Sequence, residues 1–182
     1  MNFCSNCAAP LVHRVPSGDD RPRHMCETCG SIFYENPKII AGALPVWEDK
    51  VLMCRRAIQP RYGLWTLPAG FMENGETTPQ GAARETLEEA NARVEVGELF
   101  CYLNIPRINQ VYVIFLAKLL DLDFSPGSES LEVALYTEEE MPWEAMAFPA
   151  ITTSLERFFA DRRSGQFRTH LVDIHKPAVR RV

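Results

Sequence analysis

The chain has 182 residues, 46% of them hydrophobic and 24% charged, and its formal net charge is −5. This composition is ordinary for a globular protein, and the length suits one domain with a small appendage. The negative charge offers no attraction for duplex nucleic acid, and it implies that an anionic substrate needs cations at its binding site. No apolar run approaches the roughly 18 residues that span a membrane, and no basic stretch followed by an apolar one opens the chain. We therefore expect a cytoplasmic protein.

Four of the six cysteines lie near the start of the chain as two Cys-x-x-Cys pairs. They are Cys4, Cys7, Cys26 and Cys29, with 18 residues between the pairs. Without an export signal, this spacing indicates a tetrahedral zinc site rather than disulfides, and four thiolates make such a zinc structural. A redox pair of thiols or a set of unconnected thiols is the alternative. Residues 1–35 are too few for a hydrophobic core, so we predict a zinc ribbon there, followed by a second domain over 36–182.

The second domain shows alternating strand and helix patterns, with Pro37 at its boundary. In chain order the pattern predicts strands at 39–46 and 51–54, an extended stretch at 64–71, a helix from 78 to about 90, strands at 94–103, 111–120 and 131–136, a helix over 148–165 and a last strand or tail at 168–174. Thr78 and Pro79 fit a hydroxyl N-cap followed by proline, and Asn91 fits a left-handed helix end. Strands mixed with two helices predict an α/β or α+β sandwich with a mixed sheet.

The end of the first predicted helix carries three glutamates, Glu85, Glu88 and Glu89. Their spacing places all three carboxylates on one helical face, where like charges repel. They also lie near the negative end of the helix dipole, which disfavours acids further. Hard divalent cations prefer carboxylate oxygens, so this face predicts a magnesium or manganese site. A solvated acidic surface is the alternative.

The wider stretch GFMENGETTPQGAARETLEEANA, residues 70–92, resembles the signature of the Nudix hydrolases. The matching positions are Gly70, Glu76, Arg84, Glu85, Glu88 and Glu89. Asn91 replaces the glycine of the family pattern, and Thr86 replaces an apolar residue. The resemblance implies an α/β/α sandwich with a mixed sheet, in which the three glutamates bind Mg²⁺ or Mn²⁺ and Arg84 braces them.

A zinc ribbon before such a domain is similar to the NADH pyrophosphatase branch of that family. The branch completes its metal shell with a glutamate from a later loop and a backbone carbonyl before the signature glycine. Matched by pattern, these positions fall on Glu129 and Ala69, with Glu132 as the next candidate. The SQPWPFP run of the NADH enzymes is missing, and NIPRINQVYV occupies its place at 104–113. The chain also looks like members that act on FAD and ADP-ribose.

Aromatic and basic residues near these motifs are candidates for substrate binding. Bases can stack on aromatic rings, and guanidinium groups bind phosphates bidentately. The candidate stacking residues are Tyr62, Trp65, Phe71, Tyr112 and Trp143, and the candidate phosphate ligands are Arg55, Arg56, Arg61 and Arg107. Core packing is the alternative for the aromatics, and a surface role is the alternative for the arginines. We favour Arg55, Arg61, Trp65 and Tyr112 as substrate-binding residues.

The sequence thus predicts metal-dependent hydrolysis of the pyrophosphate in a nucleoside diphosphate linked to another group, with release of AMP. ADP-ribose and FAD are the leading substrates, and NADH follows. A catalytically silent nucleotide sensor is the alternative. The predicted ribbon carries more acidic than basic residues, which disfavours a nucleic-acid partner. The resemblance also implies that the protein forms a homodimer.

Overall fold

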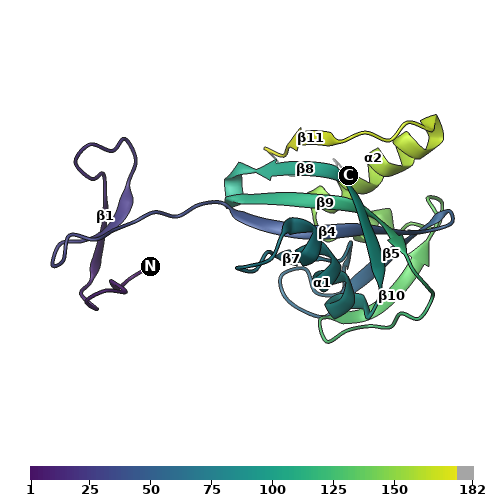
Figure 1. Cartoon of the computed structure of the whole chain (residues 1–182), viewed down its shortest axis with the longest axis horizontal. Coiled ribbons are helices and arrows are strands. Elements are labelled where there is room, and N and C mark those ends of the chain that lie inside the picture. Colours follow the sequence, from purple (N-terminus) through teal and green to yellow (C-terminus); the bar gives the residue numbers. More distant parts are fainter. Residues whose placement is uncertain (176–182) are drawn as a thin grey trace. The chain divides into compact units, whose positions relative to one another are not determined.

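The structure is a computed structural model that describes residues 1–175, and its tertiary contacts divide the chain into two compact units, Met1–Asn36 and Pro37–Val182. The first unit is a small antiparallel sheet (Figure 1), made of β1 (Leu11–Arg14), β2 (Arg23–Cys26) and β3 (Ile32–Phe33). These strands of two to four residues are too short to leave an alternating pattern in the sequence. The two units are described separately below.

The second unit is built on an eight-stranded mixed sheet with the strand order β10-β5-β4-β9-β8-β11, to which β6 and β7 pair at β5 and β4. The strands are β4 (Lys38–Trp47), β5 (Lys50–Arg56), β6 (Trp65–Thr66), β7 (Ala69–Phe71), β8 (Val94–Ile105), β9 (Gln110–Leu119), β10 (Ser130–Tyr136) and β11 (His170–Asp173). The pairs β4–β9 and β8–β11 are parallel, and the other pairs are antiparallel.

Two helices, α1 (Thr78–Ala90) and α2 (Pro149–Ser164), cover opposite faces of this sheet (Figure 1). Neighbouring residues of β4 show why, because their side chains point to opposite faces. Leu44 joins the cluster that contains Leu155 of α2, whereas Ala43 joins the cluster that contains Ala82 of α1. The predicted α/β/α sandwich with a mixed sheet is confirmed. Two short 3-10 helices, η1 (Pro106–Ile108) and η2 (Trp143–Ala145), were not predicted.

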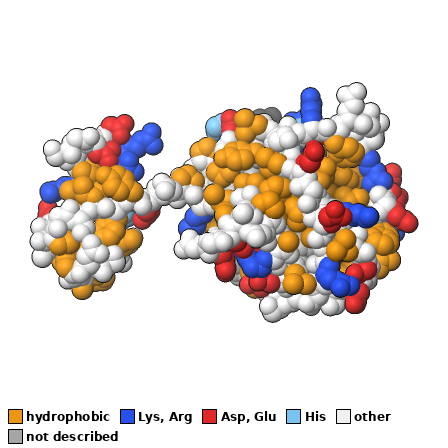
Figure 2. Space-filling model, in the orientation of Figure 1, with side chains coloured by type: hydrophobic (Ala, Val, Ile, Leu, Met, Phe, Trp, Pro, Cys, Tyr) orange, Lys and Arg blue, Asp and Glu red, His pale blue; other side chains and the backbone are white. Residues whose placement is uncertain are grey.

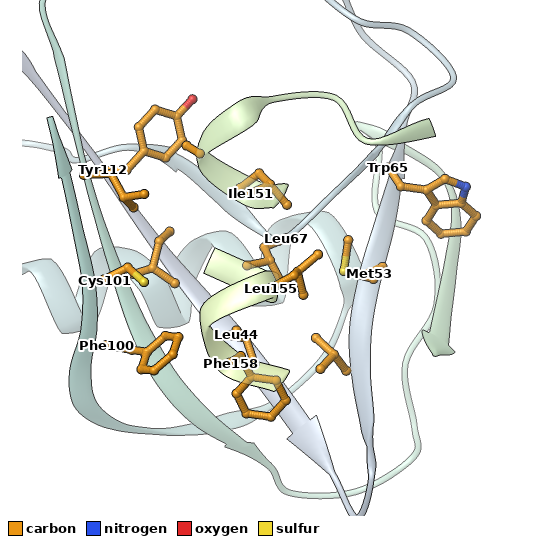
Figure 3. Close-up of a cluster of buried hydrophobic side chains, with 14 of the residues drawn as sticks. Leu44, Met53, Trp65, Leu67, Phe100, Cys101, Tyr112, Ile151, Leu155 and Phe158 are labelled. Atoms are coloured by element: carbon orange, nitrogen blue, oxygen red, sulfur yellow. The ribbon is translucent and has the colours of Figure 1, made fainter. Parts of the chain in front are cut away.

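The larger core lies between α2 and the sheet (Figure 3). Ile151, Leu155 and Phe158 of α2 face Leu44 and Met53 of the sheet, and all five are almost fully buried. At about 25 cal/mol for each Å² of apolar surface, this burial is the main force that holds the sheet and the helix together. No helix within residues 1–175 is both long and apolar enough to cross a membrane.

The ends of α1 follow the sequence prediction closely, with one correction at the N-terminus. The N-cap is Thr77 and not Thr78, and a reciprocal capping box joins Thr77 to Gln80. The cap moves by one residue because only Thr77 has a glutamine three positions later. Asn91 ends the helix in the left-handed conformation, with φ of 47°, as predicted.

The strand bounds differ from the predictions mainly at the ends of elements. The stretch 64–71 divides into β6 and β7 at Leu67 and Pro68, and β8 continues to Ile105. Lys50, one residue before the strand predicted at 51–54, begins β5. These positions are set by partners that pair across the sheet, which a local pattern does not contain.

Candidate functional site

The side chains of the three glutamates of α1 differ in their burial. Glu89 faces inward and is 6% exposed, Glu85 is partly buried, and Glu88 is exposed. The helix packs against β4 and β7, so the inward side of α1 meets the strand that carries Ala69. Along the acidic face predicted from the sequence, the exposure of the carboxylates therefore increases from Glu89 through Glu85 to Glu88.

Arg84 binds the acids of this face together. Its guanidinium donates to Glu85 Oε1 at 2.8 Å and to Glu88 Oε2 at 3.0 Å, and it contacts both oxygens of Glu76 at 2.9 and 3.0 Å. It also donates to the carbonyl oxygen of Phe71 at 3.2 Å. Hydrogen bonds from Arg84 and from the backbone N–H of Glu73 lower the pKa of Glu76 to about 2. Glu76 therefore stays ionised at neutral pH, and Arg84 is occupied by neighbouring acids and a carbonyl.

Gly70 leaves room for the carboxylate of Glu85. A Cβ atom at this position would overlap all three atoms of the Glu85 carboxyl group. Gly70 lies in β7 and pairs with Ala41 of β4, so the backbone here is fixed by the sheet. Any larger residue would push Glu85 away from the strand.

Glu89 is the most unusual acid in the described part of the chain. Its Oε2 atom is buried and has no hydrogen-bond partner among residues 1–175. Burial, followed by repulsion from Glu85, raises the pKa of Glu89 to about 8, although the backbone of Ala69 and the charge of Arg56 oppose the rise. A buried carboxylate oxygen without a donor is costly unless a cation meets it.

This donor set fits a hard divalent cation. Glu85, Glu89 and the exposed Glu129 interact through their charges, since Glu129 contributes to raising the pKa of both helix acids. Carboxylate oxygens are the ligands that Mg²⁺ and Mn²⁺ prefer. Within residues 1–175, the ribbon cysteines are the only group of three or more His, Cys, Asp or Glu side chains gathered closely enough to hold a metal ion as they stand. The carboxylates of Glu85, Glu89 and Glu129 thus lie farther apart than the ligands of a preformed metal site.

The loop that carries Glu129 is fastened to the C-terminal end of α1. The N–H groups of Gly127 and Ser125 donate to the carbonyls of Glu89 and Ala90, both at 3.0 Å. The side chain of Asn91 donates to the carbonyls of Ser125 and Pro126 at 3.2 Å. The two bonds from the loop N–H groups satisfy helix carbonyls that lack intrahelical partners, and the two from Asn91 hold the loop carbonyls. Gly127 lies so close to the helix backbone that a Cβ atom would overlap the carbonyl of Glu88.

This anchoring of the loop to α1 was not predicted from the sequence. The signal was weak, because SPGSES shows only a loop composition, and its contact with α1 depends on the tertiary fold. The clearest sequence signal for this contact was Asn91. Its backbone can adopt the left-handed conformation at the helix end, and its side-chain amide can hydrogen-bond to a neighbouring loop.

The predicted basic ligands have different environments. Arg55 donates to the carbonyl of Gly63 at 3.0 Å and lies 3.5 Å from Glu132, the further acidic candidate. Arg61 is exposed in the loop after β5. Arg56 is half-buried and donates to the carbonyl of Pro60 at 3.0 Å.

The two aromatic residues favoured from the sequence are core residues in the structure. Trp65 is 7% exposed and packs edge-on against Tyr136 at 5.1 Å, and Tyr112 is 8% exposed in the same cluster. Figure 3 shows both within the buried hydrophobic cluster. The structure supports core packing, the alternative reading of both residues, because protein atoms already cover their rings.

The remaining aromatic candidates lie differently. Phe71 is 52% exposed, with the amino group of Lys38 5.0 Å from the ring centre, and Tyr62 is 56% exposed. Trp143 packs against the core and donates from its indole nitrogen to the carbonyl of Glu138. Phe71 and Tyr62 are therefore the aromatic candidates with free ring surface.

The four ribbon cysteines form one cluster. The Sγ atoms of Cys4 and Cys29 are 3.6 Å apart, those of Cys7 and Cys26 are 3.4 Å apart, and all four lie within 4.8 Å of one another. Tetrahedral zinc with bonds of about 2.3 Å requires sulfur separations of about 3.8 Å. None of the four is in a disulfide. The cluster has the ligand number and geometry of a structural metal site.

Two hollows elsewhere on the second unit do not include the acidic face. One, of about 480 Å³, lies between α2 and β11, and the other, of about 660 Å³, lies where Val46 and Leu116 meet Phe158.

Comparisons with known proteins agree with this geometry. The family model described as Nudix N-terminal matches residues 2–35, and the NUDIX domain model matches residues 36–160. The chain is 30% identical over 133 residues to a NAD-capped RNA hydrolase NudC of Chromobacterium violaceum, covering 72% of this chain and 48% of that protein. It is 24% identical over 114 residues to an ADP-ribose pyrophosphatase of Methanocaldococcus jannaschii, covering 60% of this chain and 68% of that protein. The chain spans about half the length of the NudC relatives it matches.

A solved structure gives a closer comparison. A NUDIX hydrolase of Nitrosomonas europaea is 57% identical, with a TM-score of 0.94, and the match covers 97% of this chain and 100% of that one. The domain model alone covers more than half of the chain, and Arg84, Glu85, Glu88 and Glu89 of the signature lie on α1. The chain belongs to the Nudix hydrolase family and carries that family's N-terminal zinc-ribbon domain.

Proposed function

We propose that the acidic face hydrolyses the diphosphate of a nucleoside diphosphate linked to another group and releases AMP. The observation that carries this proposal is the buried, unpartnered Oε2 atom of Glu89 beside Glu85 and β7. A charged oxygen in that place is stable only with a cation, and a cation on this face would attract a diphosphate.

Glu85, Glu89, Glu129 and the carbonyl of Ala69 would hold Mg²⁺ or Mn²⁺, with Glu88 assisting at the exposed end. A bound divalent cation supplies charge neutralisation at the phosphate oxygens and lowers the pKa of water. In the ribbon, the cysteine cluster would hold zinc, which gives that short unit the stability that its few buried residues cannot supply.

The side chains of the site then have distinct tasks. Arg84 fixes the orientation of Glu85 and Glu88, and Glu76 keeps Arg84 in place through two hydrogen bonds. The loop anchored at Gly127 holds Glu129 near the helix acids. In the reaction, the oxygen of water forms a bond to one phosphorus and the bond from that phosphorus to the bridging oxygen breaks. For ADP-ribose the products are AMP and ribose 5-phosphate.

ADP-ribose and FAD are the leading substrates, and NADH follows, because the chain lacks the SQPWPFP run. The names of the NudC relatives raise NAD-capped RNA as a further candidate. On the face shown in Figure 2, basic side chains are scattered among acidic and hydrophobic ones and form no continuous basic patch. This distribution favours a small dinucleotide over a long RNA on that face.

A substrate panel tests the proposal. AMP release is measured with ADP-ribose, FAD, NADH and a NAD-capped oligonucleotide, each in Mg²⁺, in Mn²⁺ and without added metal. We expect metal-dependent AMP release, fastest with ADP-ribose or FAD. Tight ADP-ribose binding without AMP release in either metal would favour the silent sensor instead. Light scattering during the same work would test the predicted homodimer.

A further inference from the structure

The arginines that flank the acidic face differ in how many of their donors are occupied. The guanidinium of Arg84 donates hydrogen bonds to three glutamates and one carbonyl. Arg55 is shared between the carbonyl of Gly63 and the carboxylate of Glu132. A diphosphate that approaches this face needs a positively charged side chain with two free N–H donors side by side. In Arg84 both terminal nitrogens, and in Arg55 one of them, already contact protein oxygens.

Arg56 occupies a different position at the end of β5. It pairs across the sheet with Ser130, the residue after Glu129, and the N–H of the next residue, Ala57, donates to the carbonyl of Glu129 at 2.8 Å. Two positions earlier on the same strand, burial and then the negative charge of Glu89 raise the pKa of the Cys54 thiol. Arg56 therefore lies beside the loop of Glu129, on the strand whose Cys54 senses the charge of the buried acid.

The side chain of Arg56 is held on two sides. Its Nε atom donates to the carbonyl of Pro60 at 3.0 Å, and its guanidinium lies 5.2 Å from the ring centre of Phe148. Its two terminal nitrogens have no hydrogen-bond partner among residues 1–175. A guanidinium fixed at Nε and stacked on a ring loses little conformational entropy when its terminal donors bind a ligand.

The charge of Arg56 reaches the interior of the site. Burial raises the pKa of Glu89 and of Tyr112, and in both cases the positive charge of Arg56 opposes the rise. The guanidinium of Arg56 is thus near Glu89, the acid that would hold the cation. It reaches this acid from strand β5, whereas Arg84 lies on α1 itself. Its partly buried setting strengthens its interaction with an anion.

We propose that Arg56 binds the diphosphate of the substrate through its two terminal nitrogens. This inference rests on the proposed function, since it assigns a residue to the substrate of that same site. The planar fork of a guanidinium matches two phosphate oxygens, which a lysine ammonium does not. Arg56 would hold the diphosphate in register with Glu85 and Glu89, whereas Arg84 orients the carboxylates.

The first test measures binding, so that it does not depend on turnover. The ligand is ADP-ribose with a methylene group in place of the bridging oxygen, titrated calorimetrically into the full-length protein in Mg²⁺. We expect Arg56→Met to weaken binding by about 10-fold to 100-fold, the range for a charge-assisted hydrogen bond or two, and Arg56→Lys to restore only part of it. Wild-type affinity in both variants would overturn the proposal, and so would a wild-type protein that binds no diphosphate.

Arg162 offers a matched control. Its guanidinium also donates to a backbone carbonyl, that of Glu48 at 2.9 Å, and lies over a phenylalanine ring, that of Phe158 at 6.0 Å. It lies in the last turn of α2, near the end of β4 away from β7. Arg162→Met should lose similar structural contacts and bind the analogue as the wild type does. An equal loss of affinity in both variants would mean that Arg56 acts through folding, and the proposal would fail.

Kinetics separate this proposal from the function on which it rests. With ADP-ribose as substrate, Arg56→Met should raise KM by the same factor as the Kd of the analogue, and its melting temperature should match that of Arg162→Met. A wild-type protein that binds the analogue but releases no AMP would contradict the proposed hydrolysis and leave the role of Arg56 in binding supported. Hydrolysis with an unchanged KM in Arg56→Met would contradict the role of Arg56 alone.

Discussion

Replacing Glu89 with glutamine removes a buried charge and keeps the size of the side chain. Its folded-state pKa is raised from 4.5 to about 8. At about 1.4 kcal/mol for each pKa unit, that rise corresponds to about 5 kcal/mol of cost for the ionised form. The raised pKa adds stability only while the folded protein holds the proton, so the metal-free protein should lose stability as the pH rises from 4.5 through 8.

We therefore expect Glu89→Gln to be more stable than the wild type at pH 8.5 without divalent metal, by up to about 4 to 5 kcal/mol. At pH 5 the folded wild type still holds the proton, so the difference should fall to about 1 kcal/mol. For a domain of this size, the gain at pH 8.5 corresponds to an increase in melting temperature on the order of 10 °C.

The assay is thermal unfolding at pH 5 and pH 8.5, with and without millimolar Mg²⁺. Strong chelators are left out and zinc content is checked, because loss of ribbon zinc would also change the melting temperature. Mg²⁺ should raise the melting temperature of the wild type at pH 8.5 and leave Glu89→Gln almost unchanged. Equal metal-free melting temperatures for the two proteins at pH 8.5 would refute the argument that Glu89 is a buried, uncompensated charge.

Three further substitutions test separate parts of the site. Gly70→Ala should displace the carboxylate of Glu85 and lower kcat with little change in melting temperature, as measured by AMP release and thermal unfolding. Gly127→Ala should clash with the carbonyl of Glu88, destabilise the protein by about 1 to 3 kcal/mol in denaturant titrations and weaken Mg²⁺ binding; an unchanged protein would show that the loop is not anchored as described. Cys26→Ser should lower the bound zinc, measured by atomic absorption, because it removes one of four thiolates.

Much of the site could be predicted because its residues are close in the sequence. Glu85, Glu88 and Glu89 share one helix, so the helical repeat alone places them on one side. The helix stop at Asn91 was equally local, since a left-handed residue is a property of one position. The N-cap was predicted one residue too late, at Thr78, whereas the reciprocal bonds with Gln80 place it at Thr77.

The rest depends on contacts between distant segments. The burial of Glu89 requires β7 and β5 beside α1, and the anchoring of Glu129 requires the loop at 125–130 to reach the end of the helix. The orientation of Trp65 and Tyr112 could not be predicted for the same reason. An aromatic residue near a motif can face the substrate or the core, and the packing of α2 on the sheet determines that these two face the core. Their burial leaves Phe71 and Tyr62 as the exposed candidates.

The central claim is that the α1 acids support metal-dependent hydrolysis, and AMP release from ADP-ribose tests it most directly. The wild type, Glu85→Gln and Glu89→Gln are compared at saturating Mg²⁺ and without added metal. The account predicts release by the wild type only with metal, and a loss of roughly 100-fold or more in kcat for each variant, as when a group that stabilises developing charge is removed. Wild-type kcat in both variants, or equal release without metal, would contradict it.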